Sequence, residues 1–183
     1  MRHNVSPARG RLMADTRIRI YLNDHLGLVT GEAELARRCR DSNKGSPLAV
    51  FLDQLQSELE TQRAAIGDVI RLTGGRESRI KQGAGWLAEK VGRFKLNDSL
   101  LSYSDLSRLL ELETLAAAAH ERVALWDTLS EVLGGDDRFG GISFPWYRDQ
   151  AQTHFQKLNA ERRKAVPRAF PQPVKVEVRV QPD

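Results

Sequence analysis

A histidine and a glutamate lie inside an apolar stripe near the start of the chain. Apolar residues recur at helical spacing over residues 16–40, which predicts an amphipathic helix. His25 and Glu32 stand seven residues apart, about two helical turns, so both fall near the middle of the apolar face. A buried carboxylate is costly unless it is paired, hydrogen-bonded or bound to a metal, so these two residues are candidates for chemistry.

A later segment repeats this pattern. Residues 105–133 have helical periodicity, and Glu113, His120 and Asp127 fall inside the predicted core face at seven-residue steps. The charged residues predicted at the edge of that face or outside it are Glu111, Glu121 and Arg122. Two predicted helices therefore each direct a histidine and a glutamate toward the core.

The helix predicted over residues 47–73 adds further polar groups. Gln62 falls within its apolar face and Glu58 at the margin, four residues apart, so the two side chains can share a partner. Imidazole and carboxylate groups are ligands that suit iron, manganese and zinc in a helical bundle. The candidate metal ligands are therefore His25, Glu32, Glu58, Glu113 and His120.

Two alternatives to a metal site also fit these residues. A structural network of histidine–glutamate hydrogen bonds would fix which helix faces which. A more open bundle would leave the same residues lining a wet groove. Helix geometry also limits a metal site, because seven residues span about 10 Å and Glu113 and His120 cannot readily bind one ion. A site would therefore take one or two groups from each helix.

Start and stop signals define the helices that must position these residues. Ser46 and Ser104 are N-cap signals, and the glycine pairs at 74–75 and 134–135 are stop signals. The predicted helices cover residues 16–40, 47–73, 77–94 and 105–133, and a fifth opens at residues 143–145. Short connectors between the first four helices predict an all-α, up-down-up-down four-helix bundle with the fifth helix packed against it.

The predicted organisation is one helical domain between two tails. Its parts are a disordered basic arm over residues 1–15, a bundle over 16–134, a loop and fifth helix over 135–166, and a Pro/Val-rich tail over 167–183. In that tail, valines alternate with charged residues from Val174 to Val180, which is a strand pattern without a partner strand. Such a tail pairs with another copy, pairs with another protein, or stays disordered.

Composition and charge exclude several classes of function. The 183 residues include 28 Lys+Arg and 24 Asp+Glu, and the excess positive charge lies at the two ends of the chain. No stretch approaches the roughly 20 apolar residues of a membrane-spanning helix, so we expect no membrane partner and a cytoplasmic location.

The single cysteine makes no internal disulfide. Nucleic acid is not an expected partner, because no aromatic side chains are interleaved among the tail arginines, whereas a homo-oligomer is compatible with the pattern.

Three segments resemble a known kind of helical protein. Residues 21–26 (Tyr-Leu-Asn-Asp-His-Leu), 86–97 (Trp-Leu-Ala-Glu-Lys-Val-Gly-Arg-Phe-Lys-Leu-Asn) and 103–113 (Tyr-Ser-Asp-Leu-Ser-Arg-Leu-Leu-Glu-Leu-Glu) are similar to an uncharacterised family of bacterial ferritin-like four-helix-bundle proteins. The resemblance covers about residues 17–133 and implies a ferritin-like helical bundle, without an established activity or assigned catalytic residues.

The sequence also departs from the ferritin-like metal site. That site uses a Glu-x-x-His turn on two helices, and no histidine of this chain has a glutamate three residues before it. The connector at residues 74–75 is shorter than the long crossover that ferritins use.

Two functions are consistent with these patterns, and the sequence identifies no reaction. The first is metal binding, or weak metal-dependent redox chemistry, in the core of the bundle, with iron, manganese or zinc as the cofactor. The second is a non-enzymatic helical module that recruits a protein partner through its tails. The sequence leans toward a chain without enzymatic activity; for an enzyme, it favours a metal-dependent oxidoreductase.

Overall fold

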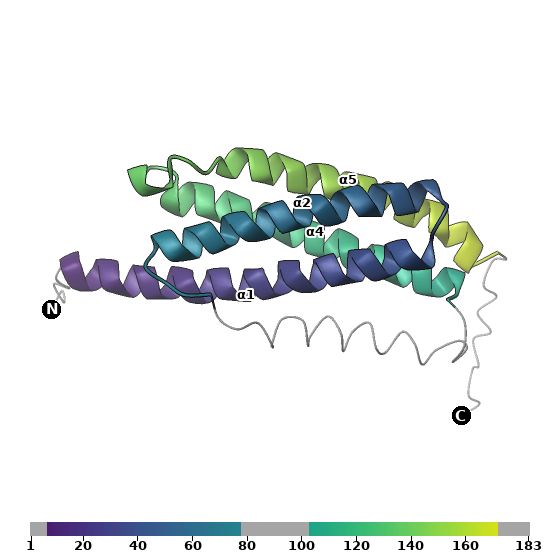
Figure 1. Cartoon of the computed structure of the whole chain (residues 1–183), viewed down its shortest axis with the longest axis horizontal. Coiled ribbons are helices and arrows are strands. Elements are labelled where there is room, and N and C mark those ends of the chain that lie inside the picture. The colour runs from purple at the N-terminus through teal and green to yellow at the C-terminus, as the bar shows by residue number, and fades with distance from the viewer. Residues whose placement is uncertain (1–6, 78–102, 172–183) are drawn as a thin grey trace, which may run out of the picture.

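The computed structural model describes residues 7–77 and 103–171, with side chains from residue 16 onward. The described residues form the helices α1 (Pro7–Ser42), α2 (Pro47–Leu72), α4 (Asp105–Leu133) and α5 (Phe144–Ala169), with a 3-10 turn, η1 (Asp137–Phe139), before α5. The four long helices lie side by side along the long axis of the molecule (Figure 1). The prediction of an all-α chain is confirmed for the described residues.

The helices α1 and α2 form an antiparallel pair. In the first half of α1, Arg19 Nε donates a hydrogen bond to the carbonyl of Thr73, just after α2, at 3.0 Å. Near the other end, Arg40 Nη1 donates to Gln56 Oε1 at 2.7 Å. The connector between the two helices is short, and Gly45 within it has φ 79°, a left-handed conformation that glycine adopts without strain.

The helices α4 and α5 form a second antiparallel pair. The ring of Trp126 on α4 stacks on Tyr147 near the start of α5, with centroids 4.6 Å apart. Further along, the ring centroids of His120 and Phe155 are 5.2 Å apart. The two pairs then pack together, α1 against α4 and α2 against α5.

The helices α2 and α4 run in the same direction, so the chain that joins them must cross the length of the bundle. Near the end of α1, Arg38 Nε donates to Glu111 Oε1, near the start of α4, at 2.9 Å. The end of α2 at Leu72 lies at the opposite end of the molecule (Figure 1). The short connectors predicted on either side of a helix over residues 77–94 lie largely outside the described residues, so they stay a prediction.

The packed helices of the described residues are α1, α2, α4 and α5. The fifth predicted helix, α5, therefore packs against the others, mainly against α4. The helix predicted over residues 77–94 lies, except for Glu77, outside the described residues, as does the valine pattern from Val174 to Val180.

Capping signals in the sequence explain most of the helix boundaries. Ser46 Oγ accepts a hydrogen bond from the Ala49 amide at 3.2 Å, and Ser104 Oγ accepts one from the Ser107 amide at 3.0 Å. Each bond satisfies one of the free amides in the first turn of a helix. Gly74, with φ 73°, follows the last turn of α2. The predicted starts of α2 and α4 are therefore confirmed.

Two boundaries lie outside the predicted ones. The helix α1 begins at Pro7, so the predicted arm over residues 1–15 is helical from residue 7. The helix α5 continues through Pro167 to Ala169, beyond the predicted end of this part at residue 166. A proline removes one backbone hydrogen-bond donor. Because Pro167 lies close to the end of the helix, few backbone hydrogen bonds depend on that donor.

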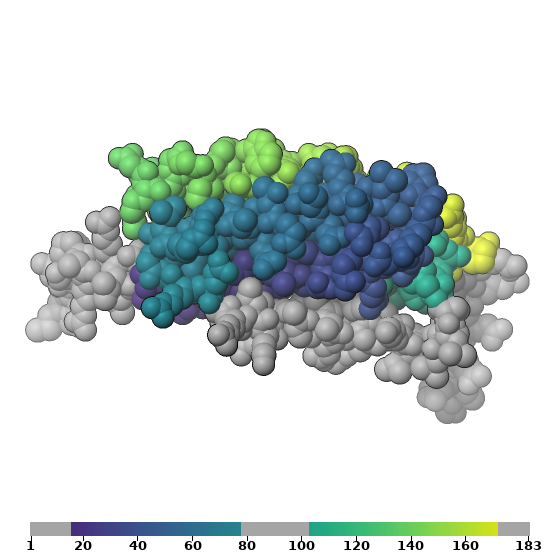
Figure 2. Space-filling model, viewed as in Figure 1, coloured from purple at the N-terminus to yellow at the C-terminus, as the bar shows by residue number. Residues whose placement is uncertain are grey.

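Leucine is the most frequent residue in the core between the helices. The fully buried side chains with the largest volumes include Leu22, Leu26, Leu52, Leu55, Leu59, Ile66, Leu112, Leu115, Leu125 and Trp126. In the space-filling view, α2 and α5 pack closely over one face of the molecule (Figure 2). Within the described residues, no helix is long and apolar enough to span a membrane.

Candidate functional site

A buried ion pair between α1 and α4 lies in the middle of the bundle. Arg122 Nε donates to Glu32 Oε2 at 2.7 Å, and Arg122 Nη2 donates to Glu32 Oε1 at 2.9 Å. The two side chains are 2% and 1% exposed, respectively. This two-point geometry is the strongest way in which an arginine holds a carboxylate.

The same guanidinium group also contacts the other two helices. Arg122 Nη1 donates to Gln62 Oε1 on α2 at 3.0 Å and lies 3.2 Å from His154 Nδ1 on α5. Gln62 Oε1 accepts a second bond from Trp126 Nε1 at 2.9 Å, and Gln62 Nε2 donates to Gln150 Oε1 at 2.7 Å. We call Glu32, Glu58, Gln62, Arg122 and His154 the core network; it takes residues from all four helices.

The contacts of His154 determine which of its ring nitrogens carries the proton. A guanidinium group can only donate hydrogen bonds, so Nδ1 of His154 must accept from Arg122. The proton therefore lies on Nε2, which donates to the Glu58 carboxylate. Burial, and next the positive charge of Arg122, lower the pKa of His154 to about 4. The ring is consequently neutral near pH 7.

The two carboxylates of the core network have opposite surroundings. Burial raises the pKa of Glu32, while the charge and hydrogen bonds of Arg122 oppose that effect. Glu58 lies nearer the surface, with its side chain 28% exposed. Burial alone would raise the pKa of Glu58, but hydrogen bonds from His154 and Gln54 outweigh it and lower the pKa. An ionised Glu58 is thus the acceptor that His154 requires.

The structure brings together only part of the predicted ligand set. His25 and Glu32 are buried, at 8% and 1% exposure, as predicted. Glu113 and His120 are exposed on α4, so the prediction that they face the core is wrong. Glu113 Oε1 lies 3.8 Å from Arg162 Nη1 at the outer edge between α4 and α5.

Glu32 and Glu58 are each bound to a partner that the predicted ligand set did not include. His25 contacts the ring of Tyr21 with centroids 4.4 Å apart, and its Nδ1 has no hydrogen-bond partner in the described part of the chain. Burial lowers the pKa of His25, while Asp24 raises it less. Among the described residues, no group of three or more His, Cys, Asp or Glu side chains could hold a metal ion.

The error on α4 has a physical cause. The helix has alanines from Ala116 to Ala119 at its centre, and small apolar side chains fit a core face in more than one rotation of the helix. The actual buried face contains Glu111, Arg122 and Trp126, which lie beside the predicted one. The charge of Arg122 predicts a position outside the core, but an arginine is buried where a carboxylate accepts its hydrogen bonds.

The buried position of His154 was not predicted, although the sequence contains a signal for it. Ala151 and Leu158 lie three residues before it and four residues after it, and both were predicted on the apolar side of this helix. In the structure both are fully buried, and His154 between them is 2% exposed. The position of Gln62 inside the apolar face of α2 is confirmed, at 0% exposure.

A second polar cluster joins the end of α1 to the start of α4. The buried Glu111 carboxylate accepts hydrogen bonds from Arg38 and, at 3.0 Å, from the Tyr103 hydroxyl. Asn43 Nδ2 donates to that hydroxyl at 3.0 Å. Cys39 lies beside them, and burial raises the pKa of its thiol to about 12, so the thiol is protonated and unreactive near pH 7.

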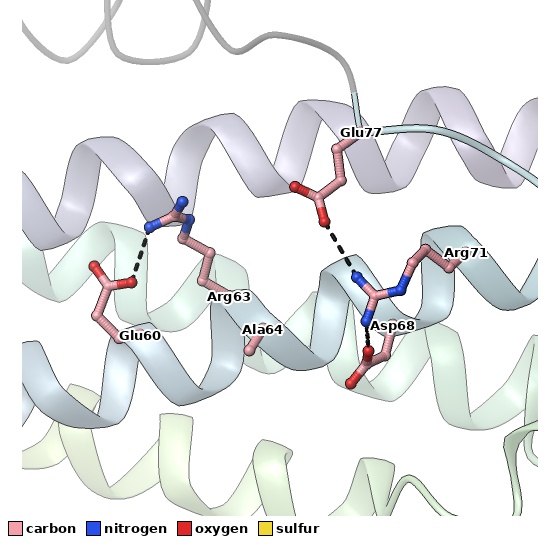
Figure 3. A pocket seen from close by; sticks show the side chains of 6 residues that line it. All are labelled: Glu60, Arg63, Ala64, Asp68, Arg71 and Glu77. Atoms are coloured by element: carbon pink, nitrogen blue, oxygen red, sulfur yellow. Dashed lines mark hydrogen bonds and ion pairs between the residues drawn. The ribbon is translucent and has the colours of Figure 1, made fainter.

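A surface pocket of about 310 Å³ lies along α2. Its lining residues are Glu60, Arg63, Ala64, Asp68, Arg71 and Glu77, as Figure 3 shows. The charges in the pocket are already paired: Arg63 Nη1 is 2.8 Å from Glu60 Oε2, and Arg71 bridges Asp68 and Glu77. The core network is therefore the stronger candidate for a functional centre.

Comparisons of the chain with protein-family models, curated proteins and solved structures found no match in any of the three. The ferritin-like resemblance therefore stays a prediction, and function must be argued from the residues themselves.

Proposed function

We propose that this chain is a non-enzymatic helical module whose core network serves the fold, and whose role is to bind a protein partner. The observation that carries this proposal is the set of hydrogen bonds that the Arg122 guanidinium donates to Glu32, Gln62 and Nδ1 of His154. The acceptor atoms of Glu32, Gln62 and His154 that surround this guanidinium are thus already engaged by a permanent cation.

The residues present do not fit a carboxylate-and-histidine metal site of the ferritin-like kind. Two of the five candidate ligands, Glu113 and His120, lie outside the core. On α5, Ala151 takes the position that glutamate has in a Glu-x-x-His turn ending at His154.

We also propose that the bundle has a ferritin-like topology. Two antiparallel helix pairs, α1 with α2 and α4 with α5, are joined by one connection between parallel helices. Ferritin-like folds have one such long connection, whereas simple up-and-down bundles have none. The direction of α2 and α4 supports this topology, and the resemblance of residues 21–26 and 103–113 agrees with it.

Metal content tests the choice between a structural and a metal-binding core. Untagged protein from cells supplied with iron, manganese and zinc is analysed beside the His25→Ala/His120→Ala double variant. We expect both to contain metal far below a stoichiometric amount. Stoichiometric metal in the native chain that disappears in the double variant would overturn the proposal.

Truncation tests the partner-binding role. The helix α5 ends at Ala169, so a chain that stops after Pro171 keeps all four described helices whole. We expect this truncated chain to melt at the same temperature as the full chain and to lose the cross-linked partner. A matched variant keeps the length and changes the alternating valines Val174, Val176, Val178 and Val180 to serine. Unchanged cross-linking in both would count against the tails as the binding segment.

A further inference from the structure

Four acceptor atoms surround the head of Arg122. They are the two carboxylate oxygens of Glu32, the amide oxygen of Gln62 and the Nδ1 atom of His154, at 2.7 to 3.2 Å from guanidinium nitrogens. They come from α1, α2 and α5, which are the three helices other than the one that carries Arg122. Each presents a lone pair to the same buried cation.

These acceptors are also of the kinds that bind divalent transition metals. Carboxylate oxygen, amide oxygen and imidazole nitrogen are common ligands of zinc, manganese, iron and cobalt. His154 also has a hydrogen bond that is typical of metal-binding histidines, because its second ring nitrogen, Nε2, donates to the Glu58 carboxylate. Metal-binding histidines almost always donate their other N–H to a carboxylate, a carbonyl or a water in this way.

We propose that the Arg122 guanidinium occupies the place of a divalent metal ion, and that shortening Arg122 converts the core network into a metal site. Glu32, Gln62 and His154 would be the ligands, with Glu58 orienting the histidine. The proposal rests on the structural role of the network given above, since in the native chain the cation is part of the protein.

Charge and space both favour a cation in the shortened variant. Arg122 is among the largest fully buried side chains, so its truncation leaves a cavity lined by acceptor atoms rather than by methyl groups. The Glu32 carboxylate would be buried there without its partner. A buried, unpaired carboxylate strongly attracts a cation or a proton, and a polar cavity does not stay empty.

The test is a titration of the Arg122→Ala variant with Co²⁺ and Zn²⁺. Cobalt bound by nitrogen and oxygen ligands is followed by its visible absorption, and zinc by calorimetry and by the rise in melting temperature. We expect saturation at one ion per chain in the variant and no saturable binding in the native chain. Native protein that binds as tightly as the variant would overturn both this proposal and the structural role of the network.

Further variants separate a built site from unspecific binding. In the Arg122→Ala background, Glu58→Gln should weaken metal binding roughly 10- to 100-fold, and His154→Gln should abolish it. Arg38→Ala is the matched control, because it removes the arginine from another buried carboxylate, Glu111, at a place with no imidazole. Equal metal binding by Arg38→Ala would show that any unpaired buried carboxylate suffices, and would overturn the proposal.

The proposal can also be tested if the Arg122→Ala variant does not fold without metal. Arg122→Met keeps most of the side-chain volume, and helix content in either variant can be followed by circular dichroism while zinc is added. We expect metal-dependent recovery of helix in a variant that does not fold alone. If neither variant gains helix, melting temperature or bound cobalt on addition of metal, the proposal is wrong, while the structural role in the native chain is unaffected.

Discussion

At the scale of the residue, one arginine determines the state of the other buried polar groups. Arg122 binds the Glu32 carboxylate through two hydrogen bonds in an apolar core and fixes the neutral tautomer of His154. A buried pair of this kind contributes little net stability over a well-packed apolar pair, but the removal of one partner leaves an uncompensated charge. On the proposal that the core network serves the fold, its contribution is to fix one arrangement of the four helices, and single substitutions within it should be costly.

The first prediction concerns the ion pair itself. Arg122→Met should lower the free energy of unfolding by about 3–5 kcal/mol, because Glu32 is left buried without its partner. The double variant Arg122→Met/Glu32→Leu should recover much of that loss, because no charge is then left in the core. Urea unfolding of both variants measures these differences. Arg63→Ala is the control, since its pair with Glu60 is half exposed and should change stability by less than about 1 kcal/mol.

The second prediction concerns pH. Burial and Arg122 lower the pKa of His154 to about 4, against an ordinary value of 6.5, so between these pH values the unfolded chain binds the proton and the folded chain does not. Stability is therefore fully present above pH 6.5 and falls as the pH drops toward 4, by about 3 kcal/mol for this group. The lowered pKa values of Glu58 and His25 add losses of the same sign on acidification.

Urea unfolding at several pH values between 4 and 8 measures this slope. The groups that face His154 are Glu58 on α2, Arg122 on α4 and, on its own helix, Lys157. His154→Gln keeps an N–H donor for Glu58 and removes the titration, so its pH dependence should be shallower than that of the native chain. An equal slope in the variant would assign the pH dependence to other groups.

At the scale of the element, local signals fixed the helix boundaries better than the helix faces. Serine caps and left-handed glycines act within a few residues, and the starts of α2 and α4 could be predicted from them. The inward face of α4 depends on what lies across from it, and its alanine-rich centre permits more than one rotation. The pairing of Arg122 with Glu32 joins residues far apart in the chain, so no local pattern could reveal it.

The candidate site was accordingly predicted only in part. Glu32, Glu58 and Gln62 belong to the core network, and the apolar stripes of their own helices were enough to place them at or near the core. The short connectors predicted before and after a helix over residues 77–94 lie largely outside the described residues and stay a prediction. The direction of α2 and α4 can be known only from contacts across the molecule.

The third prediction isolates the conformational requirement of one turn. Gly45 has φ 79° between α1 and α2, and an added Cβ there would meet no atom within 4 Å. Gly45→Ala should therefore cost about 1 kcal/mol of stability through backbone strain alone. Gly135 is the matched control, because its surroundings are equally open and its φ is not in the left-handed region. Chemical unfolding should place Gly135→Ala within a few tenths of a kcal/mol of the native chain.

At the scale of the whole molecule, the core network connects two helix pairs that are otherwise sequential hairpins. Glu32 and Arg122 join α1 to α4, and Glu58 and His154 join α2 to α5. The apolar side chains between the pairs form one continuous core. A molecule whose helix pairs share one core and are joined by buried polar contacts should unfold as a single cooperative unit.

The fourth prediction tests this cooperativity. With Trp86 and Trp146 replaced by phenylalanine, Trp126 becomes the only tryptophan and reports on the α4–α5 pair, since its ring stacks on Tyr147. Leu55→Ala on α2 should lower stability by about 2–5 kcal/mol, because it leaves a cavity at a fully buried position. Because the two pairs share one core, fluorescence and circular dichroism should shift together to the same lower urea midpoint. If circular dichroism shifts while Trp126 fluorescence keeps its midpoint, the two helix pairs unfold independently and the network does not couple them.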